Sequence, residues 1–182
     1  MKVLHLYLLI LLNLLLFFNT YLGGFKLPRF IRVGKIMSLS TNESGVAAEF
    51  FVAAELVKRG FYVSPTLKNT KSIDILIVDE ELKNPLLIQV KASQNKREWK
   101  LTEKAESLIS PKLYYIFFLF DDGNGKSEFH IVPSRFVAEY TKDYHKKYLS
   151  VSKKNGGEHK DTPMRVFHDE ENKYLDKWNL LI

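Results

Sequence analysis

The sequence predicts one α/β domain built on a mixed β-sheet, and three observations lead to this prediction. Helix-like and strand-like patterns alternate from residue 44 to the end of the chain. An apolar fraction of 46%, with only nine glycines and six prolines, excludes a disordered or collagen-like chain. A length of 182 residues suits one compact domain. The absence of cysteine excludes disulfides, thiolate metal sites and cysteine nucleophiles.

Residues 1–36 form a leader whose composition differs from that of the rest. The stretch from Val3 to Phe18 is almost entirely apolar, but a membrane span needs about 20 residues. Three interpretations are open: a membrane anchor that keeps the body in the cytoplasm, a signal peptide, or an untranslated stretch upstream of a start at Met37. We therefore divide the chain into this leader and a folded domain over 37–182, for which we expect a cytoplasmic location.

The leader also carries most of the net charge of +6. It holds five of the 27 Lys and Arg residues and no acid, which leaves 22 bases against 21 acids in the body. The body is therefore almost neutral. This excludes a protein that coats nucleic acid through its overall charge, so any site for a polyanion must be a local patch.

The body is predicted to follow the order α-β-β-β-α-β-β-α-α. A helix over 44–59, capped by Ser44 and ended by Gly60, comes first. The continuous apolar run 113–120 is typical of a strand that is buried on both faces. The other expected elements are strands over 61–64, 73–78, 86–92 and 128–132, a short helix over 102–109, a turn at 121–125, and helices over 134–150 and 169–180.

Polar residues interrupt two of these apolar strands. Asp74 lies in the second strand, and Gln89 and Lys91 lie in the third. Gln89 and Lys91 are two positions apart and face the same side, whereas Val90 faces the other side but offers its carbonyl. Ionisable groups inside strands are unfavourable unless they are paired or bind a ligand. The pattern leaves two hypotheses, a functional site or a structural ion pair between Asp74 and Lys91.

These residues resemble the PD-(D/E)xK nuclease superfamily. Ile73-Asp74 stands for the Pro-Asp of the family, Gln89-Val90-Lys91 for its (D/E)xK motif, and Glu49 for the acidic residue of its first helix. Holliday-junction resolvases and type IV restriction endonucleases, including branches with a QxK motif, are the most similar by pattern. The resemblance implies a restriction-endonuclease-like αβββαβ core over residues 44–120 with a mixed sheet, followed by extra C-terminal helices.

The resemblance also implies an activity, the metal-dependent hydrolysis of phosphodiester bonds in DNA with Mg²⁺ or Mn²⁺. Asp74 would be the main metal ligand, and Gln89, the Val90 carbonyl and Glu49 would complete the shell. Lys91 would orient the attacking water or stabilise the phosphate. Gln89 departs from the family pattern because an amide brings no charge to the metal.

The partner implied by the resemblance is nucleic acid, which we expect to be DNA, and a homodimer is one assembly open to such a protein. Two alternatives remain: a nucleic-acid-binding module that has lost catalysis through the amide at position 89, and a membrane-tethered interaction protein, which requires that the leader be real.

A short basic stretch after the third strand is the candidate for contact with nucleic acid. Lys96, Arg97 and Lys100 surround Trp99, a composition that suits phosphate contact next to a nuclease centre. The alternative is a solvated loop with Trp99 in the core. A second lysine-rich stretch over 142–154 is interpreted as a solvated helix face, and the histidines show no metal-ligand spacing.

Overall fold

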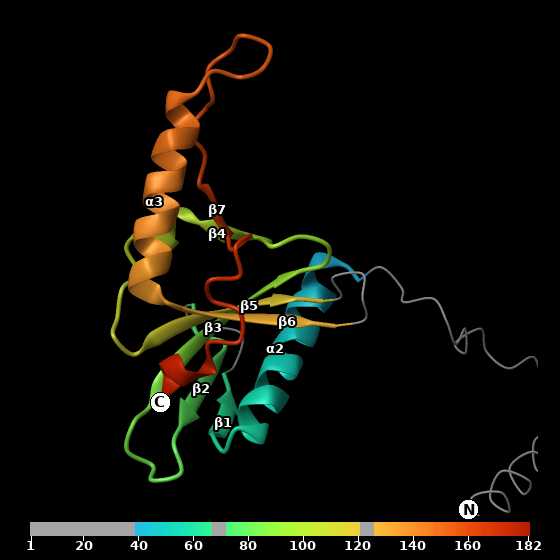
Figure 1. Ribbon diagram of the computed structural model, residues 1–182, viewed down its shortest axis with the longest axis vertical. Coiled ribbons are helices and arrows are strands. Elements are labelled where there is room, and N and C mark those ends of the chain that lie inside the picture. Colours follow the sequence, from blue (N-terminus) through green and yellow to red (C-terminus); the bar gives the residue numbers. More distant parts are fainter. Residues whose placement is uncertain (1–38, 67–71, 121–125) are drawn as a thin grey trace, which may run out of the picture. The chain divides into compact units, whose positions relative to one another are not determined.

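The computed structural model describes residues 39–66, 72–120 and 126–182, which form a mixed α/β fold as predicted (Figure 1). The leader over 1–36 and the turn expected at 121–125 lie outside the described residues. Within the described ranges, no helix combines the length and the apolar character needed to cross a membrane. The three interpretations of the leader therefore stay as they were.

Five of the strands form a mixed sheet in the order β1-β2-β3-β5-β6. β3 and β5 are parallel, and the other neighbouring pairs are antiparallel. β4 and β7 pair separately as an antiparallel ribbon. The elements are α2 (Thr41–Lys58), β1 (Tyr62–Pro65), β2 (Ile75–Val78), β3 (Leu86–Ser93), β4 (Glu98–Thr102), η1 (Glu103–Glu106), β5 (Leu113–Leu119), β6 (Glu128–Pro133), α3 (Ser134–Ser150), β7 (Met164–His168) and η2 (Trp178–Leu181).

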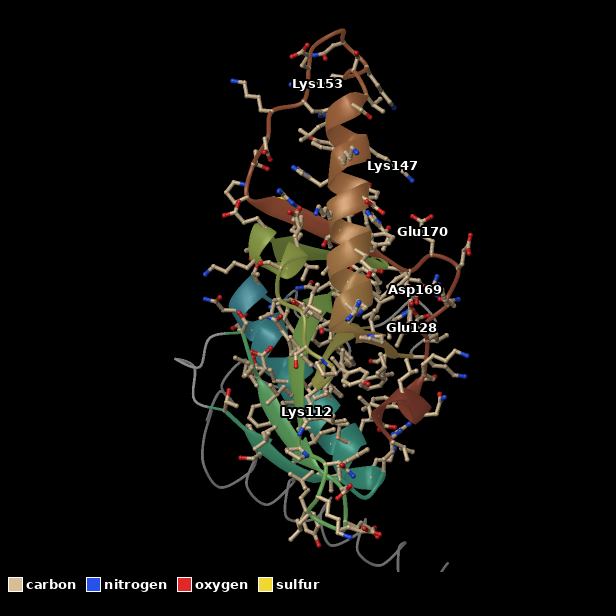
Figure 2. The ribbon with its side chains drawn as sticks, turned by 90° about the vertical axis from the view of Figure 1, so that its left-hand side faces the viewer. Lys112, Glu128, Lys147, Lys153, Asp169 and Glu170 are labelled. Carbon is tan, nitrogen blue, oxygen red and sulfur yellow. The ribbon has the colours of Figure 1, made fainter. Side chains whose placement is uncertain are left out.

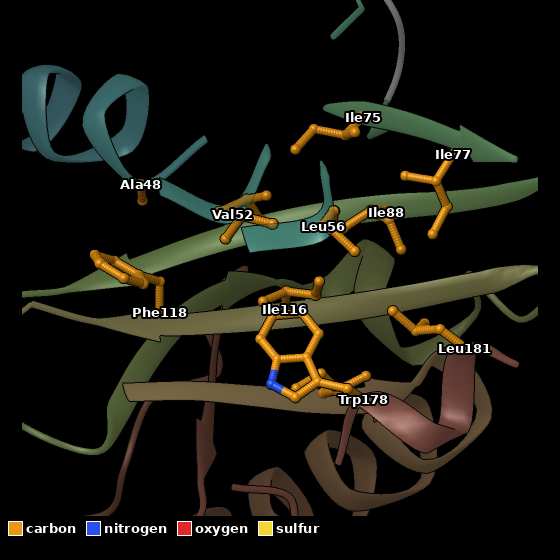
Figure 3. Packing of buried hydrophobic residues seen from close by; sticks show 12 residues of the cluster. Ala48, Val52, Leu56, Ile75, Ile77, Ile88, Ile116, Phe118, Trp178 and Leu181 are labelled. Carbon is orange, nitrogen blue, oxygen red and sulfur yellow. The ribbon is translucent and has the colours of Figure 1, made fainter. Parts of the chain in front are cut away.

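The helix α2 covers one face of the five-stranded sheet (Figure 3). Its buried side chains recur every four residues, so they form one stripe along the helix. This stripe packs on aliphatic residues of β2, β3 and β5, and burying each large aliphatic side chain contributes about 1.5–3 kcal/mol. The residues of the contact include Ala48, Val52, Leu56, Ile75, Ile77, Ile88 and Ile116.

The opposite face of the sheet is covered by the β4–β7 ribbon and α3, and its core is aromatic. The rings of Phe117 on β5 and Phe167 on β7 stack with centroids 4.4 Å apart. Trp99 on β4 is fully buried, and its indole N–H donates to the carbonyl of Phe118 at 3.0 Å. The two faces of the sheet therefore have different chemistry, and β3 lies in the middle of the sheet between them.

The first helix begins earlier than predicted. It starts at Thr41 with Ser40 as its N-cap, and Ser40 and Glu43 exchange the two hydrogen bonds of a capping box. Ser44, the expected cap, lies on the buried stripe, where its hydroxyl accepts a hydrogen bond from Gln94 at 2.6 Å. The prediction selected a capping residue one turn too late.

The helix expected over 169–180 is wrong. The chain forms β7 and then a turn, and only the short η2 follows. The carboxylate of Asp169 accepts the backbone N–H groups of Lys173 and Tyr174, both at 2.9 Å, and this closes a turn. Asn172 and Asp176 have φ angles of 57° and 52°, which interrupt a right-handed helix. The helix expected over 102–109 is reduced to the 3₁₀ turn η1, and the ribbon strand β4 was not predicted.

Candidate active site

Asp74 lies directly before β2 and is bound to β3 through both its backbone and its side chain. Its N–H donates to the Ile88 carbonyl at 2.9 Å, and its Oδ2 accepts the N–H of Val90 at 2.7 Å. These two bonds hold the carboxylate where the pairing of β2 with β3 ends, at Ile75 and Ile88. No described residue donates to Oδ1. Ser72, two residues upstream, has a φ of 64°, a backbone conformation that is uncommon outside glycine and recurs at functional sites.

β3 presents three consecutive groups beside this carboxylate. Val90 points into the core on the α2 face, whereas Gln89 and Lys91 point to the opposite face and line a hollow there. The N–H and C=O of a strand residue lie on the same edge of the strand, so the Val90 carbonyl faces the side on which Asp74 lies. We call Asp74, Gln89, the Val90 carbonyl and Lys91 the edge site.

The edge site contains no ion pair between Asp74 and Lys91. Lys91 is half-buried, and within the described part of the chain its ammonium forms no hydrogen bond or salt bridge. The hypothesis of a structural ion pair is therefore not supported. A partly buried ammonium without an internal anion is suited to an anion that arrives from outside.

Glu49 lies on the flank of α2 that faces the Asp74 side of the sheet. Phe51 stacks on Phe118 of β5 with ring centroids 5.3 Å apart, so this flank of the helix faces β5. Glu49, two residues earlier, is rotated by about 200° from Phe51 and belongs to the other flank. β1 and β2 lie on the opposite side of β3 from β5, and α2 contacts β1. Glu49 and Asp74 thus both lie toward the half of the sheet that contains β1 and β2, away from β5.

The hollow next to Gln89 and Lys91 has a volume of about 380 Å³. It lies between β3 and the layer formed by β4, η1 and the start of β7. Lys100 and Lys104 line it together with Lys91, and none of the described residues around it is acidic. Its floor includes Tyr115, and burial raises the pKa of that phenol to about 12, so it stays uncharged at neutral pH.

The edge site offers donor atoms of the kind that Mg²⁺ and Mn²⁺ prefer. Asp74, Gln89 and the Val90 carbonyl all supply hard oxygen atoms, and Asp74 keeps one oxygen available. Among the described residues, no group of three or more His, Asp or Glu side chains is arranged to hold a metal ion. The residues therefore fit a cation that retains much of its hydration shell, with Asp74 as its main anchor.

The three residues predicted to contact nucleic acid lie in different surroundings in the structure. Lys100 reaches the hollow beside the edge site, and Lys96 is exposed between β3 and β4. The guanidinium of Arg97 donates to both carboxylate oxygens of Glu128, at 2.8 and 2.5 Å. Trp99 is buried, so it is not available to stack on a base from the surface. Lys104 and Met164, which also line the hollow, were not identified from the sequence because their elements were not placed next to β3.

A second group of charged residues was not predicted from the sequence. His130 on β6 is fully buried, with Nδ1 2.7 Å from Asp169 Oδ2 and Nε2 3.3 Å from Glu128 Oε2. Figure 2 shows Glu128 and Asp169 near the beginning of α3. We call Arg97, Glu128, His130 and Asp169 the buried polar cluster. The Glu-x-His spacing on one strand, which places both side chains on one face, was the available signal.

The buried polar cluster holds its carboxylates in the ionised form. The hydrogen bond from Arg97 lowers the pKa of Glu128, and the contact with His130 adds to this. Burial raises the pKa of Asp169, but the hydrogen bonds from His130 and from backbone N–H groups outweigh it, so the pKa is lowered overall.

Comparison with known proteins assigns neither a family nor a function to the chain. No protein-family model matches the chain, and no curated protein matches it. Among solved structures, the chain is similar to a bacterial homing endonuclease, I-Ssp6803I, with a TM-score of 0.48 and 17% sequence identity. The match covers 78% of the present chain and 91% of the homing endonuclease. At this level of similarity it assigns no role to any residue of the present chain.

Proposed function

We propose that the chain is a metal-dependent endonuclease of the PD-(D/E)xK type that hydrolyses phosphodiester bonds in DNA. The observation that carries this proposal is the hydrogen bond between Asp74 Oδ2 and the N–H of Val90, which joins positions 16 apart in the sequence. It places the carboxylate beside Gln89 and Lys91, the other residues of the proposed motif. The Asp74 Oδ1 atom and the Lys91 ammonium, neither of which has a partner among the described residues, supply the two charges that phosphodiester hydrolysis requires.

The proposed chemistry adds water across one P–O bond. A bound Mg²⁺ would supply charge neutralisation and a more acidic water. The attacking water loses a proton as its oxygen bonds to phosphorus, the P–O bond to one sugar breaks, and the departing sugar oxygen takes up a proton, so that the elements of water are added across that bond. Lys91 stabilises the negative charge that increases on the phosphate oxygens, and Asp74 holds the cation in place. Glu49, on the same side of the sheet, is proposed to contribute a second carboxylate, directly or through water.

The proposed contact with DNA involves Lys96, Arg97 and Lys100, which flank the edge site along the chain after β3. Lys100 is the strongest of the three candidates because it lines the same hollow as Lys91. Arg97 has a structural role through Glu128, so its contribution to DNA binding would need a partial exchange of partners.

The test is cleavage of supercoiled plasmid by the full-length protein in mild detergent, with Mg²⁺, Mn²⁺ or EDTA. We expect cleavage with either metal, none in EDTA, and none for Lys91→Met. Lys147→Met removes an exposed lysine from α3 and serves as the control that should cleave normally. Absence of cleavage with both metals, together with a melting temperature that does not change on adding them, would contradict the proposal.

A second candidate function is a nucleic-acid-binding module with the same fold but without catalysis. The amide at Gln89, where the motif it resembles has an acid, is the observation that favours it. In that case the protein would bind DNA with an affinity that neither Mg²⁺ nor the substitution Asp74→Asn changes. For a metal-dependent enzyme, both should alter binding or cleavage.

A further inference from the structure

The hollow beside the edge site combines two kinds of surface. Three lysines reach it from three separate elements: Lys91 from β3, Lys100 from β4 and Lys104 from η1. Its other walls include apolar side chains, among them Leu108, which is half-buried, and Met164, which is 54% exposed. An exposed methionine next to lysines that form no salt bridge with a described residue suits a ligand with an apolar flat part and an anionic part.

The charge of the hollow is not cancelled from within the described chain. None of the described residues that line it is acidic, and Lys91, Lys100 and Lys104 form no salt bridge with a described residue. Glu106, which shares η1 with Lys104, is bound to Arg165 instead. The hollow therefore presents a positive potential, which attracts phosphate.

The size of the hollow limits what it accepts. About 380 Å³ lies at the small end of the range of about 300–1,000 Å³ that is usual for small-molecule sites. This volume suits a single nucleotide, and a paired base inside a double helix does not reach such a recess unless it leaves the stack.

We propose that the hollow is a nucleotide pocket that receives one unpaired nucleotide of the substrate. The base of this nucleotide lies against Leu108 and Met164. The phosphate of the nucleotide lies between Lys100 and Lys104, next to Lys91. The proposal rests on the proposed function and names the substrate class, a nucleic acid with an unpaired nucleotide at a flap, a bulge or an end. Such a nucleotide is preferred because little unstacking is needed to place it in the pocket.

The pocket is tested without any cleavage, by titration calorimetry in EDTA on the full-length protein in mild detergent. The probes are 2′-deoxyadenosine 5′-monophosphate, the nucleoside alone and inorganic phosphate. We expect the nucleotide to bind at least about tenfold more tightly than either part, because base and phosphate contact different walls. Lys100→Met and Lys104→Met should each weaken binding by roughly three- to tenfold.

Two matched pairs of variants control for general charge effects. Lys147→Met removes the same charge far from the hollow in sequence and should leave nucleotide affinity unchanged. Met164→Glu places a carboxylate at the exposed mouth and should weaken binding about tenfold, whereas Met164→Gln should have a small effect. Equal affinity for nucleotide and inorganic phosphate, or an equal loss for Lys147→Met, would overturn the pocket.

A cleavage comparison then separates the pocket from the nuclease activity itself. A duplex with a single-stranded flap should be cleaved at least about tenfold faster than the same duplex fully paired, and Met164→Glu should remove this preference. Equal rates on both substrates in the parent protein overturn the pocket and leave the nuclease proposal standing. Nucleotide binding in EDTA with no cleavage of any substrate would support the pocket and contradict the nuclease proposal.

Discussion

The buried polar cluster and the edge site use their charges in opposite ways. In the buried polar cluster, Glu128 is bound by Arg97 and His130, and Asp169 is bound by His130 and two backbone N–H groups. In the edge site, Asp74 accepts one hydrogen bond and the Lys91 ammonium has no partner within the described residues. The charged groups of the buried polar cluster have their hydrogen-bond partners within the protein, whereas Asp74 and Lys91 of the edge site can still bind a ligand.

The difference separates a structural from a functional use of charge. A buried ionisable group stabilises a fold only when its hydrogen-bonding capacity is met, because an unmet charge carries a large desolvation penalty. In the edge site, Asp74 directly before β2 and Lys91 on β3 are only half-buried, so unmet hydrogen-bonding capacity is tolerated at these two residues. We therefore expect substitutions in the buried polar cluster to change stability and substitutions in the edge site to change activity.

The largest expected effect is that of Asp74→Asn on cleavage. The amide keeps an oxygen that accepts the N–H of Val90 but brings no charge to a cation, so cleavage should fall by about 10³-fold or more. The free energy of unfolding should change by less than about 1 kcal/mol. Plasmid cleavage and urea unfolding measure the two quantities, with the exposed Glu81→Gln as the control. Full activity of Asp74→Asn would remove the edge site as a catalytic centre.

The next effect is the loss of stability in Asp169→Asn. The side chain is 5% exposed, and the amide removes the negative charge that faces the fully buried His130 and one of the two oxygen atoms that accept hydrogen bonds. We expect a decrease of about 3 kcal/mol in the free energy of unfolding. Glu170→Gln, an adjacent exposed acid, should change it by less than about 0.5 kcal/mol. If the two variants unfold at the same urea concentration, the hydrogen bonds of the Asp169 carboxylate do not stabilise the fold.

The elements that could be predicted from the sequence are those with a strong local pattern. The apolar run 113–120 became β5, and the apolar stretches 73–78 and 86–92 contain β2 and most of β3, although Asp74, expected inside the strand, lies just before β2. The helix expected over 169–180 failed because its pattern did not show that Asp169 would bind two backbone N–H groups and close a turn. Hydrogen bonds between a side chain and nearby backbone groups can override the helix propensity of a segment.

The residues of the candidate site were partly predictable for the same reason. Polar residues inside apolar strands identified Asp74, Gln89 and Lys91, since burial of such groups needs an explanation. Lys104 on η1 and Met164 on β7 were not found because the pairing of β4 with β7, which brings both elements to the hollow, is not local in the sequence. His130 was assigned no role because its partner Asp169 lies 39 positions away.

A smaller effect is expected when the missing charge is restored to the edge site. Gln89→Glu adds a carboxylate oxygen of the same reach beside Asp74, and each added charge strengthens a site for a hard cation. We expect Mg²⁺ affinity, measured by titration calorimetry, to rise about tenfold while cleavage is kept or increased. Gln94→Glu, on the α2 side of the same chain segment, should not raise the affinity. An unchanged affinity in Gln89→Glu would place the cation away from position 89.

The smallest expected effect is the pH dependence that the buried polar cluster adds to stability. The pKa of Glu128 is lowered by the hydrogen bond from Arg97, so below the ordinary glutamate value of 4.5 the unfolded chain binds more protons than the folded one. The stabilisation is therefore complete above that value and is lost as the pH falls through the lowered pKa of the folded state. Urea unfolding between about pH 5 and pH 3 should show a steeper loss for the parent protein than for Glu128→Gln. Glu170→Gln should lose stability with falling pH as steeply as the parent protein, because that acid is exposed. If the parent and Glu128→Gln lose stability equally steeply, the contacts of Glu128 are equally strong in both protonation states.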